Sequence, residues 1–409
     1  MAAPRITTAL VIPELNGQFE LQEVQLNDIQ PEEVLVEIEA SGICHTDLSC
    51  AIGLLPCRPG AVLGHEGAGK VLSVGTSITH LVPGDSVLLS FSHCESCAPC
   101  LSGHPAYCHS FNVRNFSGCR PLPVLPDGSV DITSSLSPDG VDPTADPSFA
   151  TFVTKDPGGG KPIFSQFFGQ SSFARHTLVH KSTCVKVPQG TNLALFAPMG
   201  CGMQTGAGAV LNSLGVKPGS SIAVFGVGSV GMAAVMAAAY IAKAKTIIAV
   251  DLQPSRLELA KKLGATHGVL AAGTLNGAAA DADLKGEIRK ICPPVGVDYA
   301  LDCTGSVAVI RTMIDVLGTR GRAATVGAPG FGKEVAVDVM EHLTYGKEYV
   351  GSSEGDSCPK EFIPFLIEQH AKGNFPMDQF VTFYDFKDYK QALEDSHKGK
   401  AIKAVLKWS

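Results

Sequence analysis

Four cysteines near residue 100 have a spacing typical of a metal site. The spacing is C-x2-C-x2-C-x7-C, and the residues are Cys94, Cys97, Cys100 and Cys108. Thiolates two residues apart can both point inward from a tight loop, and four of them complete a tetrahedron around Zn²⁺. Because four protein ligands leave no open position, we expect a structural zinc site. An iron–sulfur cluster is the alternative, which is disfavoured because nothing else in the chain indicates electron transfer.

A second set of metal-binding side chains is dispersed along the chain. Cys44 precedes His-Thr-Asp, His65 lies within Gly-His-Glu, and Cys201 lies within Met-Gly-Cys-Gly. Each is weak evidence alone, since an isolated cysteine is usually a buried packing residue. Together, two thiolates and one imidazole could bind one zinc and leave a fourth position for water or substrate.

A glycine-rich turn indicates a nucleotide cofactor. Gly226, Gly228 and Gly231 form G-x-G-x-x-G between an apolar strand and an alanine-rich helix, and Asp251 ends the next predicted strand. The glycines let the backbone approach a pyrophosphate at the helix N-terminus. A carboxylate at Asp251 would accept a hydrogen bond from the ribose 2′-hydroxyl, so NAD is favoured over NADP. Arg256 opposes this preference because a nearby arginine can accommodate a 2′-phosphate.

The elements that position these residues suggest two domains, as expected for 409 residues. Short β-rich runs such as Val34–Glu39 and Ser86–Ser90, separated by Gly and Pro, predict a barrel-like β domain. From about residue 218, strands alternate with helices, which predicts a parallel sheet. Residues 119–161 are rich in Pro, Asp, Ser and Gly, so we expect one long surface loop there.

Composition narrows the class of protein. The formal charge of −7 argues against a nucleic-acid or anionic-membrane partner, and no run is long enough to span a bilayer. The thirteen cysteines are an odd number, and no signal peptide is recognisable, so metal binding is a better explanation for them than disulfides. We expect a cytoplasmic protein.

The ordered motifs resemble those of the zinc-containing medium-chain alcohol dehydrogenases over nearly the whole chain. These motifs are Cys-His-Thr-Asp, Gly-His-Glu, the four cysteines, Met-Gly-Cys-Gly, the glycine fingerprint and Val326-Gly-Ala-Pro. The segment Phe167-Phe-Gly-Gln-Ser-Ser-Phe is most similar to the aryl- and benzyl-alcohol branch. The resemblance implies an α/β fold with a GroES-like β-barrel catalytic domain and a doubly wound Rossmann domain. Its implied boundaries are 1–203 for the catalytic domain, 204–350 for the NAD-binding domain, and 351–409 for a return to the catalytic domain.

The resemblance also implies residue roles. Cys44, His65 and Cys201 would bind the catalytic zinc, which makes two zinc ions per subunit. Thr46 would hydrogen-bond the substrate hydroxyl and pass its proton toward the ribose. The other residues expected to act near the zinc are Asp47, which would orient a ligand, Glu66 and Ser49. Besides the glycine fingerprint, Asp251 and Arg256, the residues expected at the cofactor are His45 and Lys403, at its pyrophosphate, and Val326.

Two departures from the family pattern concern the proton relay and the pocket. Ser49 stands where many relatives have the histidine that ends the relay, so proton release would use water or a slower route. The 119–161 segment is also longer than in typical relatives. The expected substrate pocket is apolar and is formed by Ser90, Phe91, Phe167, Phe168 and Ala328.

The resemblance thus predicts hydride transfer between a nicotinamide cofactor and a small primary alcohol or aldehyde, aromatic or allylic in character. Aldehyde reduction in a fungal secondary-metabolite pathway is one expectation. A glutathione-dependent formaldehyde dehydrogenase is the nearest alternative, and a non-enzymatic structural relative is an alternative of another class. Two zinc ions per chain would exclude a zinc-free quinone reductase. Family habit implies a homodimer or homotetramer, built by pairing the cofactor domains edge to edge.

Overall fold

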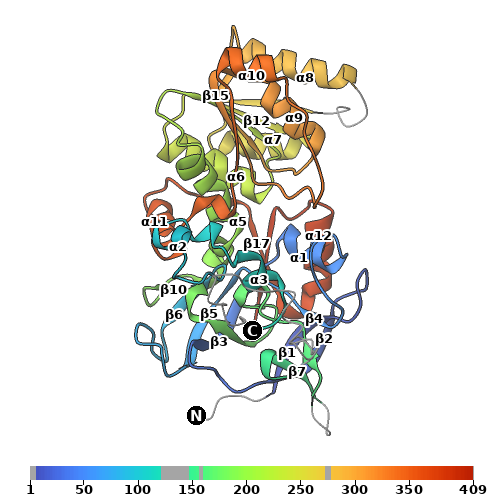
Figure 1. The fold of residues 1–409 in the computed structure, drawn as a ribbon, viewed down its shortest axis with the longest axis vertical. Coiled ribbons are helices and arrows are strands. Elements are labelled where there is room, and N and C mark those ends of the chain that lie inside the picture. The colour runs from blue at the N-terminus through green and yellow to red at the C-terminus, as the bar shows by residue number, and fades with distance from the viewer. Residues whose placement is uncertain (1–5, 121–146, 156–159, 272–277, 409) are drawn as a thin grey trace. The chain divides into compact units, whose positions relative to one another are not determined.

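The computed structural model describes residues 6–120, 147–155, 160–271 and 278–408, without the side chains of 278–283. The fold comprises two units (Figure 1). Unit 1 contains Met1–Cys201, Cys358–Pro364 and Phe380–Ser409. Unit 2 contains Gly202–Ser357 and Phe365–Gln379. Among the described residues, no helix has the length and apolar character needed to cross a membrane.

Unit 1 is built on two largely antiparallel sheets. The first has the order β4-β1-β2-β7-β8, with β1 (Ile6–Ile12), β2 (Glu20–Leu26), β4 (Ala61–Val62), β7 (Phe152–Thr154) and β8 (Pro162–Ile163). The second has the order β10-β6-β5-β3-β18-β17, and β9 also pairs with β3. Its strands are β3 (Glu33–Gly42), β5 (Gly67–Val74), β6 (Ser86–Leu89), β9 (His176–His180), β10 (Cys184–Val187), β17 (Val381–Asp385) and β18 (Lys403–Lys407).

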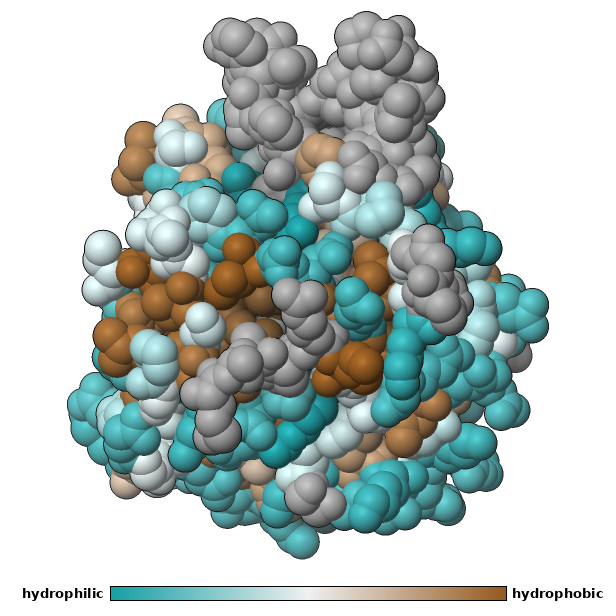
Figure 2. Space-filling model, turned by 90° about the horizontal axis from the view of Figure 1, so that it is seen from below, coloured by the Kyte–Doolittle hydropathy of each residue, from teal (hydrophilic) through white to brown (hydrophobic). Residues whose placement is uncertain are grey.

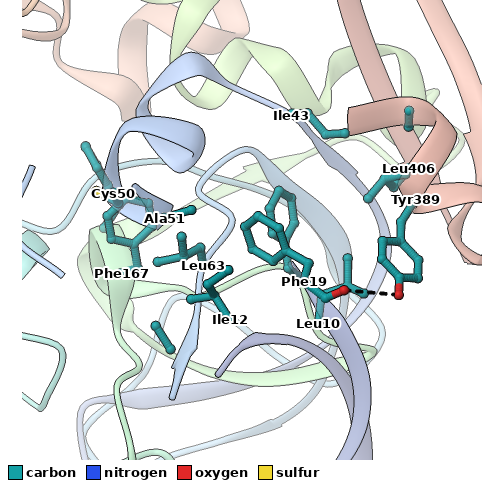
Figure 3. Close-up of a cluster of buried hydrophobic side chains, with 14 of the residues drawn as sticks. Leu10, Ile12, Phe19, Ile43, Cys50, Ala51, Leu63, Phe167, Tyr389 and Leu406 are labelled. Atoms are coloured by element: carbon teal, nitrogen blue, oxygen red, sulfur yellow. Dashed lines mark hydrogen bonds between the residues drawn. The ribbon is translucent and has the colours of Figure 1, made fainter. Parts of the chain in front are cut away.

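Short helices connect the strands of unit 1. They are α1 (His45–Ala51), α2 (Ala98–Leu101), α3 (Phe111–Phe116), α4 (Leu193–Phe196) and α12 (Tyr389–His397). A core of Leu10, Ile12, Leu63 and Phe167 meets the buried face of α1 (Figure 3). The hydroxyl of Tyr389 donates to the Phe19 carbonyl at 3.2 Å and ties α12 to this core. On the face seen in Figure 2, hydrophobic residues form patches within a largely hydrophilic surface.

Unit 2 has a six-stranded, all-parallel sheet with the order β13-β12-β11-β14-β15-β16. Its strands are β11 (Ser221–Phe225), β12 (Thr246–Asp251), β13 (His267–Leu270), β14 (Val297–Asp302), β15 (Leu317–Thr325) and β16 (Glu348–Gly351). Its helices are α5 (Gly202–Gly208), α6 (Ser229–Met236), α7 (Pro254–Lys262), α8 (Ala278–Ile291), α9 (Val307–Asp315) and α10 (Val339–Tyr345), and α11 (Pro359–Ala371) crosses the unit boundary.

Local sequence explains several ends of these helices. Pro254 begins α7, where its missing N–H costs no helical hydrogen bond. Asp338 caps α10, because its Oδ1 accepts a hydrogen bond from the Glu341 N–H at 3.0 Å. Gly346 ends α10 with φ +60°, a conformation that glycine adopts without steric cost.

The predicted fold class is confirmed: a β-rich domain accompanies a parallel α/β domain. The unit boundaries differ from the predicted ones, since residues 351–357 and 365–379 group with unit 2. Hydrogen bonds explain part of this difference. The Ser213 and Ser352 hydroxyls lie 2.7 Å apart, and the Asn212 amide donates to the Gly355 carbonyl at 3.1 Å.

The predicted loop 119–161 needs correction in its described parts; residues 121–146 and 156–159 lie outside the described chain. Strand β7 lies within this segment, pairs with β2, and buries Phe152 completely. The three-residue run Phe-Val-Thr is too short to show an alternating pattern among its Pro and Gly neighbours. Pairing with β2, rather than local sequence, therefore determines its structure.

Candidate active site and metal centres

The four clustered cysteines converge in unit 1 around α2. Their ligand atoms all lie within 4.8 Å of one another, and none of the four forms a disulfide. The Sγ–Sγ distances are 3.8 Å for Cys94–Cys100, 3.5 Å for Cys97–Cys100 and 3.9 Å for Cys97–Cys108. A tetrahedron with Zn–S bonds of about 2.3 Å has edges of about 3.8 Å. The four sulfurs therefore fit a zinc ion.

Backbone and hydroxyl donors surround these sulfurs. The Cys97 N–H donates to Cys94 Sγ, and the Cys94 N–H donates to Cys108 Sγ, each at 3.3 Å. Burial would raise the pKa of Cys94, but hydrogen bonds from Ser96 and Cys97 lower that pKa to about 5. Because a thiolate is the form that binds metal, these donors favour binding at Cys94.

The dispersed ligands also come together within unit 1. Cys44 directly precedes α1, His65 lies just before β5, and Cys201 directly precedes α5. Their ligand atoms lie within 4.8 Å of one another. The His65 Nε2 is buried and has no hydrogen-bond partner among the described residues. A buried ring nitrogen beside two sulfurs fits a metal ion that leaves one position open.

Asp47 makes hydrogen bonds to two of the three expected ligand residues, Cys44 and His65, and to Gly64. Its Oδ1 lies 2.9 Å from His65 Nδ1 and accepts the Gly64 N–H at 3.0 Å, while its Oδ2 accepts the Cys44 N–H at 2.9 Å. Because a carboxylate can only accept, Nδ1 carries a proton, and Nε2 is the ring nitrogen that would bind a metal in its deprotonated form. Asp47 is completely buried, so the ring orientation is fixed by a desolvated contact.

Neighbouring charges and hydrogen bonds also shift the pKa values of Cys44 and His65. A hydrogen bond from Cys201 and the nearby His65 hold the pKa of Cys44 well below its ordinary value, although burial opposes them. Burial would lower the pKa of His65, but Asp47 and Cys44 raise it well above its ordinary value. Thr46 Oγ1 lies 3.6 Å from Cys44 Sγ, and both Thr46 and Ser49 are half-buried on α1.

Glu66 and Lys403 form a buried ion pair. Lys403 Nζ lies 2.8 Å and 2.9 Å from the two Glu66 carboxylate oxygens and donates to the Ile43 carbonyl at 3.1 Å. The two side chains are 1% and 0% exposed. Gly42 makes room for the pair, because a Cβ at this residue would lie 2.0 Å from Glu66 Oε2. Lys403 was expected at the cofactor pyrophosphate, and that role stays a prediction, as it does for the exposed His45.

An aromatic wall lies against His65. The ring of Phe168 stacks on the imidazole with centroids 4.5 Å apart, and Phe167 meets it edge-on at 5.3 Å. Phe116 lies 5.1 Å from Phe168, and Phe111 lies 5.6 Å from Phe91. Phe111 and Phe116 were missed by sequence analysis; their spacing on α3, five residues apart, gave no signal of a shared site.

The two remaining residues of the predicted pocket, Ser90 and Ala328, belong to different units. Ser90 is completely buried in unit 1, and its Oγ donates to the Gly200 carbonyl at 2.7 Å. Ser90 therefore connects β6 to the residue before Cys201. Ala328 is an exposed residue of unit 2, where its backbone packs against Gly305. A shared pocket of Ala328 with the unit 1 residues stays a prediction.

The glycine fingerprint occupies the turn between β11 and α6 in unit 2. Gly226 has φ +83°, and a Cβ at Gly231 would lie 2.1 Å from the Gly226 carbonyl oxygen. A Cβ at Gly228 would meet no atom within 4 Å, so space remains beside the backbone at the start of α6. This arrangement suits a phosphate group at the helix N-terminus.

Asp251 lies at the end of β12, beside the fingerprint. Its Oδ2 accepts the Val227 N–H at 2.9 Å, and its Oδ1 accepts the Gln253 N–H at 3.0 Å. Arg256 Nη1 lies 3.8 Å from Asp251 Oδ2. The two residues on which the prediction of NAD or NADP depends, Asp251 and Arg256, are thus adjacent. Val326 follows β15, and its N–H donates to the Asp302 carbonyl at 2.9 Å.

Comparison with known proteins agrees with the two-domain fold. The profile of the alcohol dehydrogenase GroES-like domain matches residues 30–133, and that of zinc-binding dehydrogenases matches residues 229–369. Geraniol dehydrogenase of Castellaniella defragrans is 35% identical, covering 97% of this chain and 96% of its own. The S-(hydroxymethyl)glutathione dehydrogenase of a Synechocystis species is 32% identical, covering 97% and 98%.

A solved structure extends this likeness. Benzyl alcohol dehydrogenase of Acinetobacter calcoaceticus is 38% identical and superposes with a TM-score of 0.84, covering 99% of this chain and 100% of its own. Identity above 30% over nearly the full length of several dehydrogenases shows the family. The chain is an oxidoreductase and belongs to the zinc-containing alcohol dehydrogenases of the medium-chain dehydrogenase family.

Proposed function

We propose that this alcohol dehydrogenase interconverts a primary aromatic or allylic alcohol and its aldehyde. The observation that carries the proposal is the aromatic wall, in which Phe168 stacks on the His65 imidazole with Phe91, Phe111 and Phe116 behind it. Aromatic rings stack favourably on flat, unsaturated partners and bury large apolar areas. A planar substrate therefore gains more from this wall than a small aliphatic alcohol such as ethanol.

Two relatives support the same substrate class. One is named for geraniol, an allylic primary alcohol, and one for benzyl alcohol, an aromatic primary alcohol. Both match nearly the whole chain, so the likeness includes the segments that bear the aromatic wall. Aldehyde reduction in a fungal pathway stays an expectation, because nothing in the wall distinguishes the direction of reaction.

The residues around the metal centre suggest a division of roles. Cys44, His65 and Cys201 would hold a zinc ion, which supplies Lewis acidity that favours the alkoxide form of the substrate. Asp47 keeps the imidazole oriented. Thr46, beside Cys44, is placed to hydrogen-bond the substrate hydroxyl and pass its proton on. Ser49 can relay a proton only through its hydroxyl, so we expect water to complete the relay.

We propose a second, structural zinc at the four-cysteine site and NAD as the cofactor. The sulfur–sulfur distances support four thiolate ligands. The buried Asp251 carboxylate beside the fingerprint supports NAD, because it would repel a 2′-phosphate. Arg256 weakens that repulsion. The substitution Asp251→Ala should therefore increase the use of NADPH relative to NADH, because Arg256 would remain to bind the 2′-phosphate.

A glutathione-dependent formaldehyde dehydrogenase is the second candidate, supported by the relative named S-(hydroxymethyl)glutathione dehydrogenase. Such an enzyme needs cations at the pocket mouth for the glutathione carboxylates. Arg114, which follows Phe111 on α3, has its Nε 3.2 Å from the Ser110 hydroxyl. Arg114 thus lies on the same helix as Phe111 and Phe116, but the phenylalanine rings of the wall carry no charge, which favours an apolar substrate.

The test is an assay of purified holoenzyme with NADH and with NADPH. The aldehydes are benzaldehyde, cinnamaldehyde and acetaldehyde, and hydroxymethylglutathione is assayed in the oxidative direction with NAD and NADP. We expect kcat/KM to be highest for the two aromatic aldehydes with NADH. Preference for hydroxymethylglutathione would establish the second candidate, and no turnover of any substrate by zinc-replete protein would refute both and favour a non-enzymatic role.

We also propose that a second copy of the chain pairs with unit 2 at β16. Among the described strands, β16 lies at the end of the sheet order and pairs with β15 alone. Large apolar side chains are exposed on neighbouring α10, namely Val339, Met340 and Leu343. An edge strand beside an exposed apolar face suits a symmetric dimer. Light scattering should give a dimer or tetramer, and Leu343→Asp should lower the mass; a monomeric wild-type protein would refute this.

A further inference from the structure

The segment that carries the aromatic wall has an unusual backbone. Gln166, Phe168 and Ser171 have φ of 56°, 51° and 52°, and Gly169 has φ 68°. Left-handed conformations are unfavourable for residues other than glycine, and a bulky side chain such as Phe rarely adopts them. In this segment they bring both Phe167 and Phe168 against the His65 imidazole. The surrounding structure must hold the segment in place.

The C-terminal end of the segment pairs with the residues that lead from β4 to His65. The Phe173 N–H donates to the Leu63 carbonyl at 3.0 Å, and the Ser172 N–H donates to the Gly64 carbonyl at 2.9 Å. The next step of this ladder would reach His65. At that point the backbone has already turned away, because Ser171 is left-handed.

Where the backbone hydrogen bonds of the segment end, the side chain of Gln170 makes the next ones. Its Nε2 donates to the His65 carbonyl at 2.9 Å and to the Ser90 carbonyl at 3.0 Å. Its Oε1 accepts the Gly67 N–H at 3.0 Å. A carboxamide offers the same kinds of donor and acceptor as a peptide bond, and Gln170 is completely buried with both its amide and its carbonyl group hydrogen-bonded.

These bonds connect two of the three expected zinc ligands. Gln170 holds the carbonyl of His65 itself, and it also holds Ser90. The Ser90 hydroxyl in turn donates to the carbonyl of Gly200, the residue before Cys201. Gly200 packs tightly here, because a Cβ on it would lie 1.9 Å from the Leu89 carbonyl oxygen. A continuous set of buried hydrogen bonds thus runs from His65 to the residue beside Cys201.

We propose that Gln170 is a positioning residue for the metal cluster. Its carboxamide replaces a missing peptide group, fixes the backbone at His65 and Gly67, and sets the distance from His65 to Cys201 through Ser90. The same bonds let the segment turn and place Phe168 on the imidazole. Gln170 therefore links the position of the aromatic wall to the geometry of the expected zinc ligands. The kinetic consequence rests on the proposed function; the effect on metal binding does not.

The chain offers a matched control. Gln166 is a second buried glutamine of the same segment, also left-handed, and its Nε2 donates to the Leu178 carbonyl at 2.9 Å, away from the metal cluster. Gln166→Met and Gln170→Met make the same chemical change at both positions. Both remove a buried amide, so both should lower thermal stability. They differ in the hydrogen bonds that are lost: the Gln170 side chain loses its bonds to His65, Ser90 and Gly67, and the Gln166 side chain loses its bond to Leu178.

The experiment measures metal binding first. Zinc release from the holoenzyme to a chelator is followed for both variants, and the visible d–d spectrum is recorded after cobalt replaces the catalytic zinc. Contacts that orient metal ligands typically contribute about 10–100-fold to metal affinity or activity. We expect Gln170→Met to weaken binding of one zinc within that range, to shift the cobalt bands, and to reduce kcat with aromatic aldehydes. Gln166→Met should leave the cobalt bands unchanged.

Equal effects of the two variants on zinc release and cobalt bands would overturn the proposal, because Gln170 would then act only through general stability. If Gln170→Met does not fold, Gln170→Asn keeps the amide but shortens its reach by one methylene, and it should show the same changes to a smaller degree. Unchanged cobalt bands in a folded Gln170→Asn protein would also overturn it. If no substrate is turned over, the metal measurements still decide the role of Gln170.

Discussion

The ion pair of Glu66 and Lys403 lies next to His65 and is fully desolvated, which makes its removal a sharp test of the structure. Nζ makes three close contacts, two with the carboxylate and one with the Ile43 carbonyl. Burial raises the pKa of Glu66, although Lys403 opposes this. Lys403→Met would therefore leave a carboxyl group that is neutralised at a cost, and Glu66→Gln would leave a buried ammonium group.

The expected magnitude follows from that burial. Removing one partner of a buried pair costs about 3–5 kcal/mol, whereas replacing both partners by neutral groups is often nearly neutral. We therefore expect each single variant to lower the free energy of unfolding by about 3 kcal/mol or more. The double variant Glu66→Gln/Lys403→Met should be more stable than either single variant.

Urea unfolding followed by fluorescence measures these differences. The single tryptophan, Trp408, stacks on Phe386 with centroids 3.6 Å apart and reports on unit 1, which contains the pair. Lys398→Met is the control, because Lys398 and Glu394 form an exposed pair at the C-terminal end of α12 that should contribute little. Single-variant effects that simply add in the double variant would refute the reasoning, since they would show that the two charges do not depend on each other.

Three further predictions concern other parts of unit 1. Cys97→Ala should remove one zinc and destabilise the fold, whereas Cys201→Ala should abolish turnover with little change in Tm; metal analysis and calorimetry check both, and the reverse pattern would contradict the assigned roles. Burial lowers the pKa of His180 from 6.5 to about 4, so the unfolded chain binds the extra proton first and stability should fall as pH drops through this window. The full loss is up to about 3 kcal/mol, and urea titrations should show a flatter pH dependence for His180→Gln, an unchanged slope being the contrary result. Gly42→Ala should destabilise the protein because the new Cβ would displace Glu66, and a Tm equal to wild type would show that the carboxylate can move freely.

Sequence alone predicted the fold class, because the alternation of apolar strands with helices and the glycine fingerprint are local patterns. It also selected the two groups of residues that the structure brings close enough together to hold a metal ion. For the four cysteines spacing sufficed, since they lie within one short segment. Cys44, His65 and Cys201 needed the family resemblance, because their approach depends on the tertiary fold.

The features that the sequence did not predict leave no pattern among neighbouring residues. Gln170 bonds His65 across 105 residues, and Lys403 bonds Glu66 across 337 residues. Neither residue type at such a separation predicts a contact, and a lysine near the C-terminus is ordinarily a solvated surface charge. Strand β7 was missed because a run of three residues gives no period. Tertiary pairing decided each of these features.

The most direct test of the two-zinc account is anomalous X-ray scattering from crystals of the holoenzyme at the zinc absorption edge. The account predicts two peaks per subunit, one enclosed by Cys94, Cys97, Cys100 and Cys108 and one at Cys44, His65 and Cys201, with Zn–S distances of about 2.3 Å. A peak at the four-cysteine site alone, in protein that turns over aldehydes, would contradict the catalytic role assigned to the second cluster.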